Sequence, residues 1–416
     1  MSKFKRLINE WMLVVVAFGC LGSLFFVRPA TWLSTVLIVL ASLIVVFDAE
    51  LKNRFVRLFQ DERLKLIAWP FVIWFGVALL ISIVHSVDQR FHGPSNELRF
   101  FLSLSILCFL PHKKTKCAFH IGLIVSACAA AVWGWYEVWW VGEWRAQGTT
   151  NNPIHFGNLT ALVALLCFSV ALMDKTLVIV LRIALLLSAS MAVFASFTSL
   201  TRSSVIIILC AVPLIWSPRK DLFHKLFVKV ASIFLVAIIC LIGFSTQVQE
   251  RLRIHELTAA FNSPDQIDYE RLTSNRANMW YAAVLMFEEN PLIGVGPRGF
   301  AQTFQKLADQ GLVKTTAFHN QPHNDILYSA SMGGVLKLLA YCCLIGGPFF
   351  YFWQSYQARN NLTSAISAIL GMQVVGAYFL TGLTNSNFDL QIYSTTYAVL
   401  VCVLAKLSVV SEAPTA

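Results

Sequence analysis

One short stretch, residues 319–325, holds the side chains with the clearest chemical potential, and it reads HNQPHND. An apolar run with small residues follows at once, so a polar site adjoins a buried helix. Asn324 is placed to cap that helix, and Asp325 falls in its first turn, where the helix dipole favours an anion. His323 then lies just outside the helix start. Because histidine titrates near neutrality, it can take a proton from a hydroxyl, and His323 is the predicted chemical centre.

Two arginines are the main candidates for binding an anion. Arg202 sits in SFTSLTRSSV, where the chain turns between two apolar stretches. An ionisable group at membrane depth is costly and marks a functional site by default, although a turn arginine can also contact lipid phosphate. Arg276 precedes Met279 and Trp280 by three and four residues, so it shares the apolar face of one helix. It is therefore held against the membrane domain, either in a salt bridge or on a substrate anion.

Six further residues are weaker candidates: His319, Asn324, Arg99, Arg145, Asn152 and Asp389. Arg99 begins a predicted span on the outer side, and snorkelling to headgroups is its alternative explanation. Arg145 and Asn152 lie in VGEWRAQGTTNNPIHFGNL, a stretch of turn formers that a plain loop would also explain. Asp389 lies in the last outward connection, GLTNSNFDLQIY, together with Asn385 and Asn387.

The chain as a whole is too apolar for a soluble protein. Of its 416 residues, 57% are hydrophobic and 13% are charged, with a mean hydropathy of +0.66; soluble domains are about 45–50% apolar. Because one span takes about 20 apolar residues, the sequence predicts an all-α polytopic membrane protein of about 12 transmembrane helices with a long, partly helical periplasmic loop. The predicted spans are 11–27, 30–48, 67–84, 99–111, 118–141, 156–173, 177–199, 203–216, 226–246, 325–352, 363–382 and 391–409.

The positive charge follows a topology pattern. The formal net charge is +10, but lysines and arginines gather before the first predicted span and in every second connection, such as 52–65, 112–116 and 219–225. This positive-inside pattern predicts that both termini are cytoplasmic and that the candidate arginines and His323 face the other side. No nucleic-acid-binding motif accompanies the charge, so we expect no nucleic-acid partner.

We expect four segments along the chain. Residues 1–246 form transmembrane helices one to nine, 247–324 form the long periplasmic loop, 325–410 form the last three transmembrane helices, and 411–416 form a disordered cytoplasmic tail. The loop carries helix signals after Thr273. The helix expected there has an apolar face that consists of Met279, Trp280, Ala283, Val284 and Phe287.

Two loop motifs carry less weight. GVGPRG, residues 294–299, formally matches a dinucleotide fingerprint, but no strand precedes it, and we expect its glycines to make a tight turn between two loop helices. Asp265, Asp268 and Glu270 form an acidic cluster, which either binds a divalent metal ion or is simply solvated.

The outward-facing arginines and histidine suit a lipid-linked pyrophosphate donor. Guanidinium forks match phosphate oxygens bidentately, and two of them can neutralise a pyrophosphate without a metal. Apolar helices would hold the lipid tail while the headgroup lies under the loop. No ATP is available on that side, so the energy for transfer must reside in the phosphate bond of the donor.

These features together resemble the O-antigen ligase and polymerase superfamily of bacterial membrane glycosyltransferases. The resemblance rests on the long outer loop, an arginine before an apolar helix, ENPLIGVGPRGF, and HN before an apolar, glycine-ended helix. RAQGTTNNPIHFGNL and TRSS are similar to two further family patterns. It implies that His323 is the base and that Arg202 and Arg276 hold undecaprenyl pyrophosphate. His319 is a departure from the family pattern. His323 is preferred because it directly precedes Asn324 and the helix.

The modest length without an added soluble domain is more similar to the ligase than to protein O-oligosaccharyltransferases. The resemblance implies metal-independent, inverting transfer of O-antigen from undecaprenyl pyrophosphate to a sugar hydroxyl of lipid A-core, with no cofactor. The implied location is the bacterial inner membrane, among membrane lipid, with the site facing the periplasm. An O-antigen polymerase, a protein O-oligosaccharyltransferase and a lipid-linked glycan transporter are alternatives, although the sequence shows neither the inverted repeats nor the broken helices typical of transporters.

Overall fold

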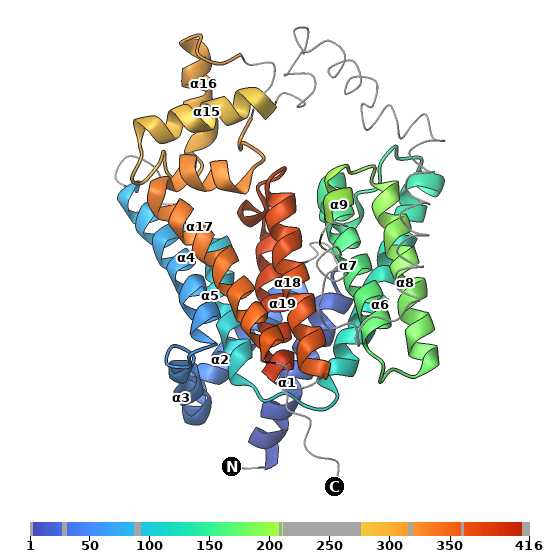
Figure 1. Ribbon diagram of the computed structural model, residues 1–416. Helices are drawn as coiled ribbons and strands as arrows, with labels where there is room; N and C mark the ends of the chain where they lie inside the picture. The colour runs from blue at the N-terminus through green and yellow to red at the C-terminus, as the bar shows by residue number, and fades with distance from the viewer. Residues whose placement is uncertain are drawn as a thin grey trace. The chain divides into compact units, whose positions relative to one another are not determined.

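The computed structural model describes residues 3–26, 31–86, 93–207, 210, 276–314, 319–358 and 362–409 (Figure 1). Every regular element in these ranges is helical, as the sequence predicts. The chain divides into two compact units. The first comprises Met1–Leu214, Leu339–Thr381 and Asn387–Ala416, and the second comprises Ile215–Leu338 and Gly382–Ser386. The predicted span 226–246, the acidic cluster 265–270 and the tail 411–416 lie outside the described residues.

Seven of the described helices are long and apolar enough to cross a membrane, so the chain is a membrane protein. They are α4 (Lys65–Val84), α6 (Thr115–Trp135) with the π-helix that follows it (Tyr136–Val141), α7 (Pro153–Met173), α8 (Ile179–Thr198), α17 (Asp325–Gln357), α18 (Leu362–Gly382) and α19 (Gln391–Val409). Counting one bent pair as a further span gives up to 8 in the described part. The predicted count of twelve is therefore not confirmed.

The N-terminal helices differ in part from the predicted spans. α1 covers Lys3–Gly22, and α2 (Trp32–Phe47) bends by 105° into α3 (Ala49–Arg57). In place of a continuous span at 99–111, α5 (Ser95–Ser103) leads into a 3-10 helix (Leu104–Cys108). Ser105 Oγ bonds the carbonyl of Leu102 at 2.7 Å, and such local bonds compete with regular helix geometry.

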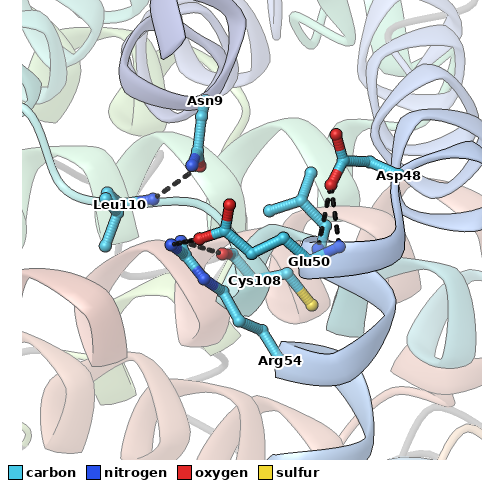
Figure 2. A network of polar contacts seen from close by, with 7 residues as sticks. Asn9, Asp48, Glu50, Arg54, Cys108 and Leu110 are labelled. Carbon is cyan, nitrogen blue, oxygen red and sulfur yellow. Dashed lines mark hydrogen bonds and ion pairs between the residues drawn. The ribbon is translucent and has the colours of Figure 1, made fainter. Parts of the chain in front are cut away.

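Figure 2 shows the polar contacts that Asp48 and Arg54 make beside the bend between α2 and α3. Asp48 Oδ1 accepts from the backbone N–H groups of Glu50 at 3.0 Å and Leu51 at 3.2 Å, which caps α3. Arg54 pairs with Glu50 at 2.5 Å and donates to the carbonyl of Cys108 at 3.3 Å. Arg54 is one of the basic residues that mark the predicted cytoplasmic side, and it also bonds the last carbonyl of the 3-10 helix.

The second unit contains two helices of the long loop, α15 (Arg276–Glu289) and α16 (Gly299–Asp309), together with the start of α17. The expected apolar face of α15 is rotated. Met279 and Ala283 are buried as predicted, whereas Val284 is 40% exposed. The buried positions are Met279, Ala282, Ala283 and Met286, and they pack with Phe300, Phe304, Leu307, Val313, Tyr328 and Met332.

Helix α17 is broken at Gly334, whose backbone is left-handed (φ +61°, ψ −159°). The turn between α15 and α16 fills the break. Backbone N–H groups of Val295 and Gly296 donate to the carbonyls of Ser331 and Met332 at 2.9 and 3.1 Å. The sequence did not predict this break within the span expected at 325–352. The buried backbone groups freed by the break find partners in the loop, which removes the cost of leaving them unpaired.

Glycine is required where these two backbones meet. A Cβ on Gly334 would lie 2.2 Å from the carbonyl carbon of Leu292, and one on Gly294 would lie 2.4 Å from the backbone of Met332 and Gly333. Gly294 is itself left-handed, with φ +64°. The GVGPRG motif is thus the tight turn expected between two loop helices, and it also packs against α17.

Candidate functional site

His323 lies at the start of α17 in a strained conformation. Its φ of +51° falls in the left-handed region, which non-glycine residues seldom occupy. Asn324 caps the helix, because its Oδ1 accepts from the N–H groups of Ile326 at 2.9 Å and Leu327 at 3.1 Å. Asp325 follows in the first turn and is 1% exposed. The predicted cap and first-turn aspartate are confirmed.

Helix α15 brings Arg276 to His323. The indole Nε1 of Trp280 donates to the carbonyl of Pro322 at 3.0 Å, which holds the residue before His323 against α15. Arg276 lies one helical turn before Trp280 and so on the same side of α15. Its positive charge acts on the His323 ring. The second unit thus brings together two residues that were predicted independently.

A further segment of the second unit, Gly382–Ser386, packs against the start of α17. Asn324 Nδ2 donates to the carbonyl of Leu383 at 3.1 Å. A Cβ on Gly382 would lie 2.4 Å from Asp325 Oδ2, so glycine allows this approach without a shift of the carboxylate. The start of α17, directly after His323, is therefore covered by the connection that follows α18.

From that connection, Asn385 reaches the candidate base. Its side chain is 1% exposed and forms a hydrogen bond with the His323 ring. Asn385 was noted in the sequence together with Asn387 and Asp389, but only Asp389 was ranked as a candidate. Its signal was weak. It is one of several polar residues in GLTNSNFDLQIY, and spacing alone cannot show which of them faces the histidine.

The surroundings of His323 favour its neutral form. Burial lowers the pKa of the imidazole from its ordinary value, and the charge of Arg276 lowers it further; the hydrogen bond to Asn385 raises this pKa, and His319 lowers it. A neutral imidazole keeps a lone pair near pH 7, as a general base must. The buried Nδ1 atom makes no hydrogen bond to any residue in the described part of the chain.

Arg276 is itself partly withdrawn from water. Burial lowers the pKa of its guanidinium from the ordinary value, and no described carboxylate contributes to that pKa. A desolvated cation is stabilised by an anion placed beside it. The sequence left two alternatives for Arg276, a salt bridge and a substrate anion. The described residues supply no partner for a salt bridge.

His319 has different surroundings from His323. Its ring packs edge-on against Phe304 of α16, with 5.3 Å between centroids, and burial lowers its pKa. His323, by contrast, adjoins the half-buried guanidinium of Arg276 and the buried amide of Asn385. These contacts favour His323 over His319 as the reacting group, in agreement with its position next to Asn324.

Arg202 lies in the first unit, directly before the short helix α9 (Ser203–Ile206). The turn that leads to it is braced by Arg145, whose Nε donates to the carbonyl of Ser199 at 2.8 Å and whose Nη2 donates to Thr201 Oγ1 at 3.4 Å. Leu200 within the turn is left-handed, with φ +50°. Arg145 thus supports the arginine that was ranked above it. The pairing of Arg202 with Arg276 stays a prediction.

The three remaining weaker candidates all lie in the first unit, and each makes a hydrogen bond within it. Asn152 caps α7, since its Oδ1 accepts from the N–H of Ile154 at 2.8 Å. Arg99 donates from Nη1 to the hydroxyls of Thr35 and Thr395, so it is held among helices rather than extended to headgroups. The carbonyl of Asp389 accepts from Asn96 Nδ2 at 2.6 Å.

Within the described residues, no group of three or more His, Cys, Asp or Glu side chains is arranged to hold a metal ion. The acidic cluster of Asp265, Asp268 and Glu270 lies outside those residues, so the alternatives of metal binding and simple solvation both stand. The side chains that act on the pKa of His323 are the guanidinium of Arg276, the amide of Asn385 and the imidazole of His319.

Two comparisons with known proteins bear on this site. Residues 183–342 match a family model described as O-antigen ligase, and this match includes Arg202, Arg276 and His323. Over 98 residues, the chain is also 31% identical to an uncharacterized protein of Haemophilus influenzae. That alignment covers 23% of this chain and 24% of the relative, so the matched part spans about a quarter of the relative's length.

Proposed function

Because residues 183–342 belong to the O-antigen ligase superfamily, we propose that this protein is an O-antigen ligase. It transfers O-antigen polysaccharide from undecaprenyl pyrophosphate to a sugar hydroxyl of lipid A-core, at the periplasmic face of the bacterial inner membrane. The observation that carries the proposal is the approach of Arg276 to His323 in the second unit. A half-buried cation beside a neutral imidazole suits a reaction that creates an anion and removes a proton.

The proposed reaction is an inverting glycosyl transfer. His323 takes the proton of the acceptor hydroxyl as that oxygen forms a bond to the anomeric carbon of the donor. The bond between that carbon and the pyrophosphate oxygen breaks, and the electron pair leaves with the pyrophosphate. Arg276 and Arg202 stabilise the charge that grows there, an effect that can reach about 3–4 kcal/mol for one well-placed donor.

The strained backbone of His323 supports this role. A left-handed non-glycine residue costs of order 1 kcal/mol or more and persists only where its surroundings enforce it. Here the Asn324 cap follows the residue, and the Trp280 bond to Pro322 precedes it. Because both neighbours are anchored, the imidazole is held in one place relative to the guanidinium of Arg276, and preorganisation of this kind lowers the barrier to proton transfer.

Metal independence follows from the charge that the two arginines supply. Purified protein should transfer glycan in the presence of EDTA at the rate seen without it. If EDTA abolished transfer and Mg²⁺ restored it, the cluster of Asp265, Asp268 and Glu270 would become the leading metal site and the arginine-only scheme would be wrong.

The experiment that tests the ligase assignment is complementation in two bacterial hosts, one lacking its ligase and one lacking its polymerase. Lipopolysaccharide is read on a silver-stained gel, in hosts whose glycans match this protein. A ladder restored on lipid A-core in the first host alone, and lost with His323→Ala, is expected. Restoration in the second host alone would make the protein a polymerase, and the donor site would survive. Restoration in neither host, with glycosylated protein in the membrane, would favour the protein O-oligosaccharyltransferase.

The broken helix α17 is the one observation that favours transport of a lipid-linked glycan, since transporters often coordinate substrate at broken helices. In this chain the freed carbonyls of Ser331 and Met332 are already bonded to Val295 and Gly296. The break is thus filled by protein rather than left open to a substrate. A transporter should also tolerate His323→Ala, whereas the enzyme should not.

A further inference from the structure

We propose that Asn385 is a positioning residue for transfer, which holds the His323 ring in the orientation where it acts as a base. This inference rests on the function proposed above and assigns the base a partner from a distant part of the chain. Asn385 touches neither sugar nor pyrophosphate in the scheme, so its role is exerted through the imidazole.

The placement of Asn385 follows from three contacts in the second unit. Its own side chain bonds the imidazole. Two residues earlier, the carbonyl of Leu383 accepts from Asn324 Nδ2 at 3.1 Å. One residue before that, Gly382 lies so close to Asp325 that a Cβ would meet its carboxylate at 2.4 Å. Three successive residues at the start of α17 are therefore each met by the segment that carries Asn385.

Asn385 cannot move easily from this position. Its side chain is 1% exposed, and the neighbouring Ser386 is fully buried. A buried amide is costly unless its polar atoms are bonded. The hydrogen bond to the ring therefore fixes both partners, as the third member of a nucleophile–base–orienter arrangement does in other hydrolases and transferases.

The neutral charge of Asn385 matters as much as its position. The charged or titratable groups that face or adjoin His323 are Arg276 from α15, His319 from the preceding stretch, and Asp325 at the start of α17. An amide that accepts from the ring orients it without adding negative charge, so the imidazole stays neutral beside Arg276. A carboxylate at the same position would favour the imidazolium, which has no lone pair for the proton.

Asn387 shows what a purely structural amide looks like in this connection. Its Nδ2 donates to the carbonyl of Tyr378 at 3.1 Å and to Thr381 Oγ1 at 2.9 Å, and its side chain is fully buried. Those partners belong to α18 and carry no candidate chemistry. Asn387→Ala is therefore the matched control, because it removes a buried amide two residues away whose two hydrogen bonds above are to α18.

The first test reads the imidazole directly. The full chain, labelled with 15N-histidine and held in lipid nanodiscs, is titrated by NMR, and the His323 signal is assigned by its loss in His323→Ala. Asn385→Asp should raise the pKa of His323 by about one unit or more. Asn385→Ala should lower it, because a hydrogen bond that favours the imidazolium is lost. Asn387→Ala should leave it unchanged. An unchanged His323 pKa in both Asn385 variants would overturn the inference.

The second test reads transfer, with undecaprenyl-pyrophosphate-linked O-antigen as donor and rough lipopolysaccharide as acceptor. Asn385→Ala should lower kcat by about fivefold, the equivalent of one hydrogen bond, with the KM of the donor unchanged. Asn385→Asp should move the acidic limb of the pH profile to higher pH. Wild-type kcat in Asn385→Ala would overturn the positioning role. Wild-type transfer by His323→Ala would overturn the proposed base instead, and the NMR titration separates the two failures because it requires no activity.

Discussion

The indole Nε1 of Trp280 lies 3.0 Å from the carbonyl oxygen of Pro322 and donates a hydrogen bond to it. This single bond joins α15, which begins at Arg276, to the residue before His323. Because Arg276 lies one turn earlier on the same side of α15, the bond also sets how near the guanidinium comes to the imidazole. The proposed catalytic pair therefore depends on a residue that takes no part in the chemistry.

Trp280→Phe should keep the aromatic packing and lose this hydrogen bond. A partly buried bond of this kind contributes about 1 kcal/mol, so transfer should fall by about fivefold at equal protein level. Initial rates of glycan transfer by the purified protein measure the effect. Tyr281→Phe is the control, since Tyr281 is the next residue and is 51% exposed. Equal rates for both variants would show that the Pro322 contact does not control the site.

Arg276→Lys should keep the charge beside His323 but lose the planar fork that matches phosphate oxygens. If Arg276 holds the pyrophosphate bidentately, kcat should fall by about a hundredfold or more, as happens when a donor to transition-state charge is removed. Transfer assays at matched expression measure this loss. Arg298→Lys makes the same exchange at an exposed site of the second unit and should keep wild-type activity. Full activity in Arg276→Lys would return Arg276 to a structural role.

The pH dependence of transfer should reflect the lowered pKa of His323. The base must be neutral, so kcat/KM should fall only when the pH drops through a pKa below the ordinary value of 6.5. Arg276→Gln removes a positive charge that lowers this pKa, so the acidic limb of the residual activity should move to higher pH. A profile measured between mild acid and neutrality checks the sign. An acidic limb that moved to lower pH in Arg276→Gln would contradict the proximity of the two residues.

Gly334→Ala should prevent the loop turn from packing against α17. The new Cβ would meet the carbonyl carbon of Leu292 at 2.2 Å, and φ at this residue is +61°, so the variant should lose about 3 kcal/mol or more of stability. Thermal unfolding in detergent measures the loss. Gly346→Ala is the control within the same helix, because nothing lies within 4 Å of its new Cβ. Equal melting temperatures in the two variants would show that the break at Gly334 tolerates a side chain.

The sequence alone predicted the features that depend on residues close together in the chain. The apolar runs predicted membrane helices, and seven long ones are present among the described residues. The cap at Asn324 and the first-turn position of Asp325 were predicted from residue type and order alone, because capping involves groups two or three residues apart. The turn formed by Gly294 and Gly296 was predicted for the same reason, since glycine marks where a backbone must turn or approach another closely.

The tertiary structure decided which distant groups meet. Asn385 is about sixty residues from His323, and only the folding of the segment after α18 onto the start of α17 brings their side chains together. The break at Gly334 was missed for a similar reason. A glycine inside an apolar run reads as continuous helix unless the partner that bonds its freed backbone groups is known, and here that partner is the turn at 291–296. The periodicity of apolar residues indicates which residues share one face of a helix. The contacts described here depend instead on the packing of separate segments.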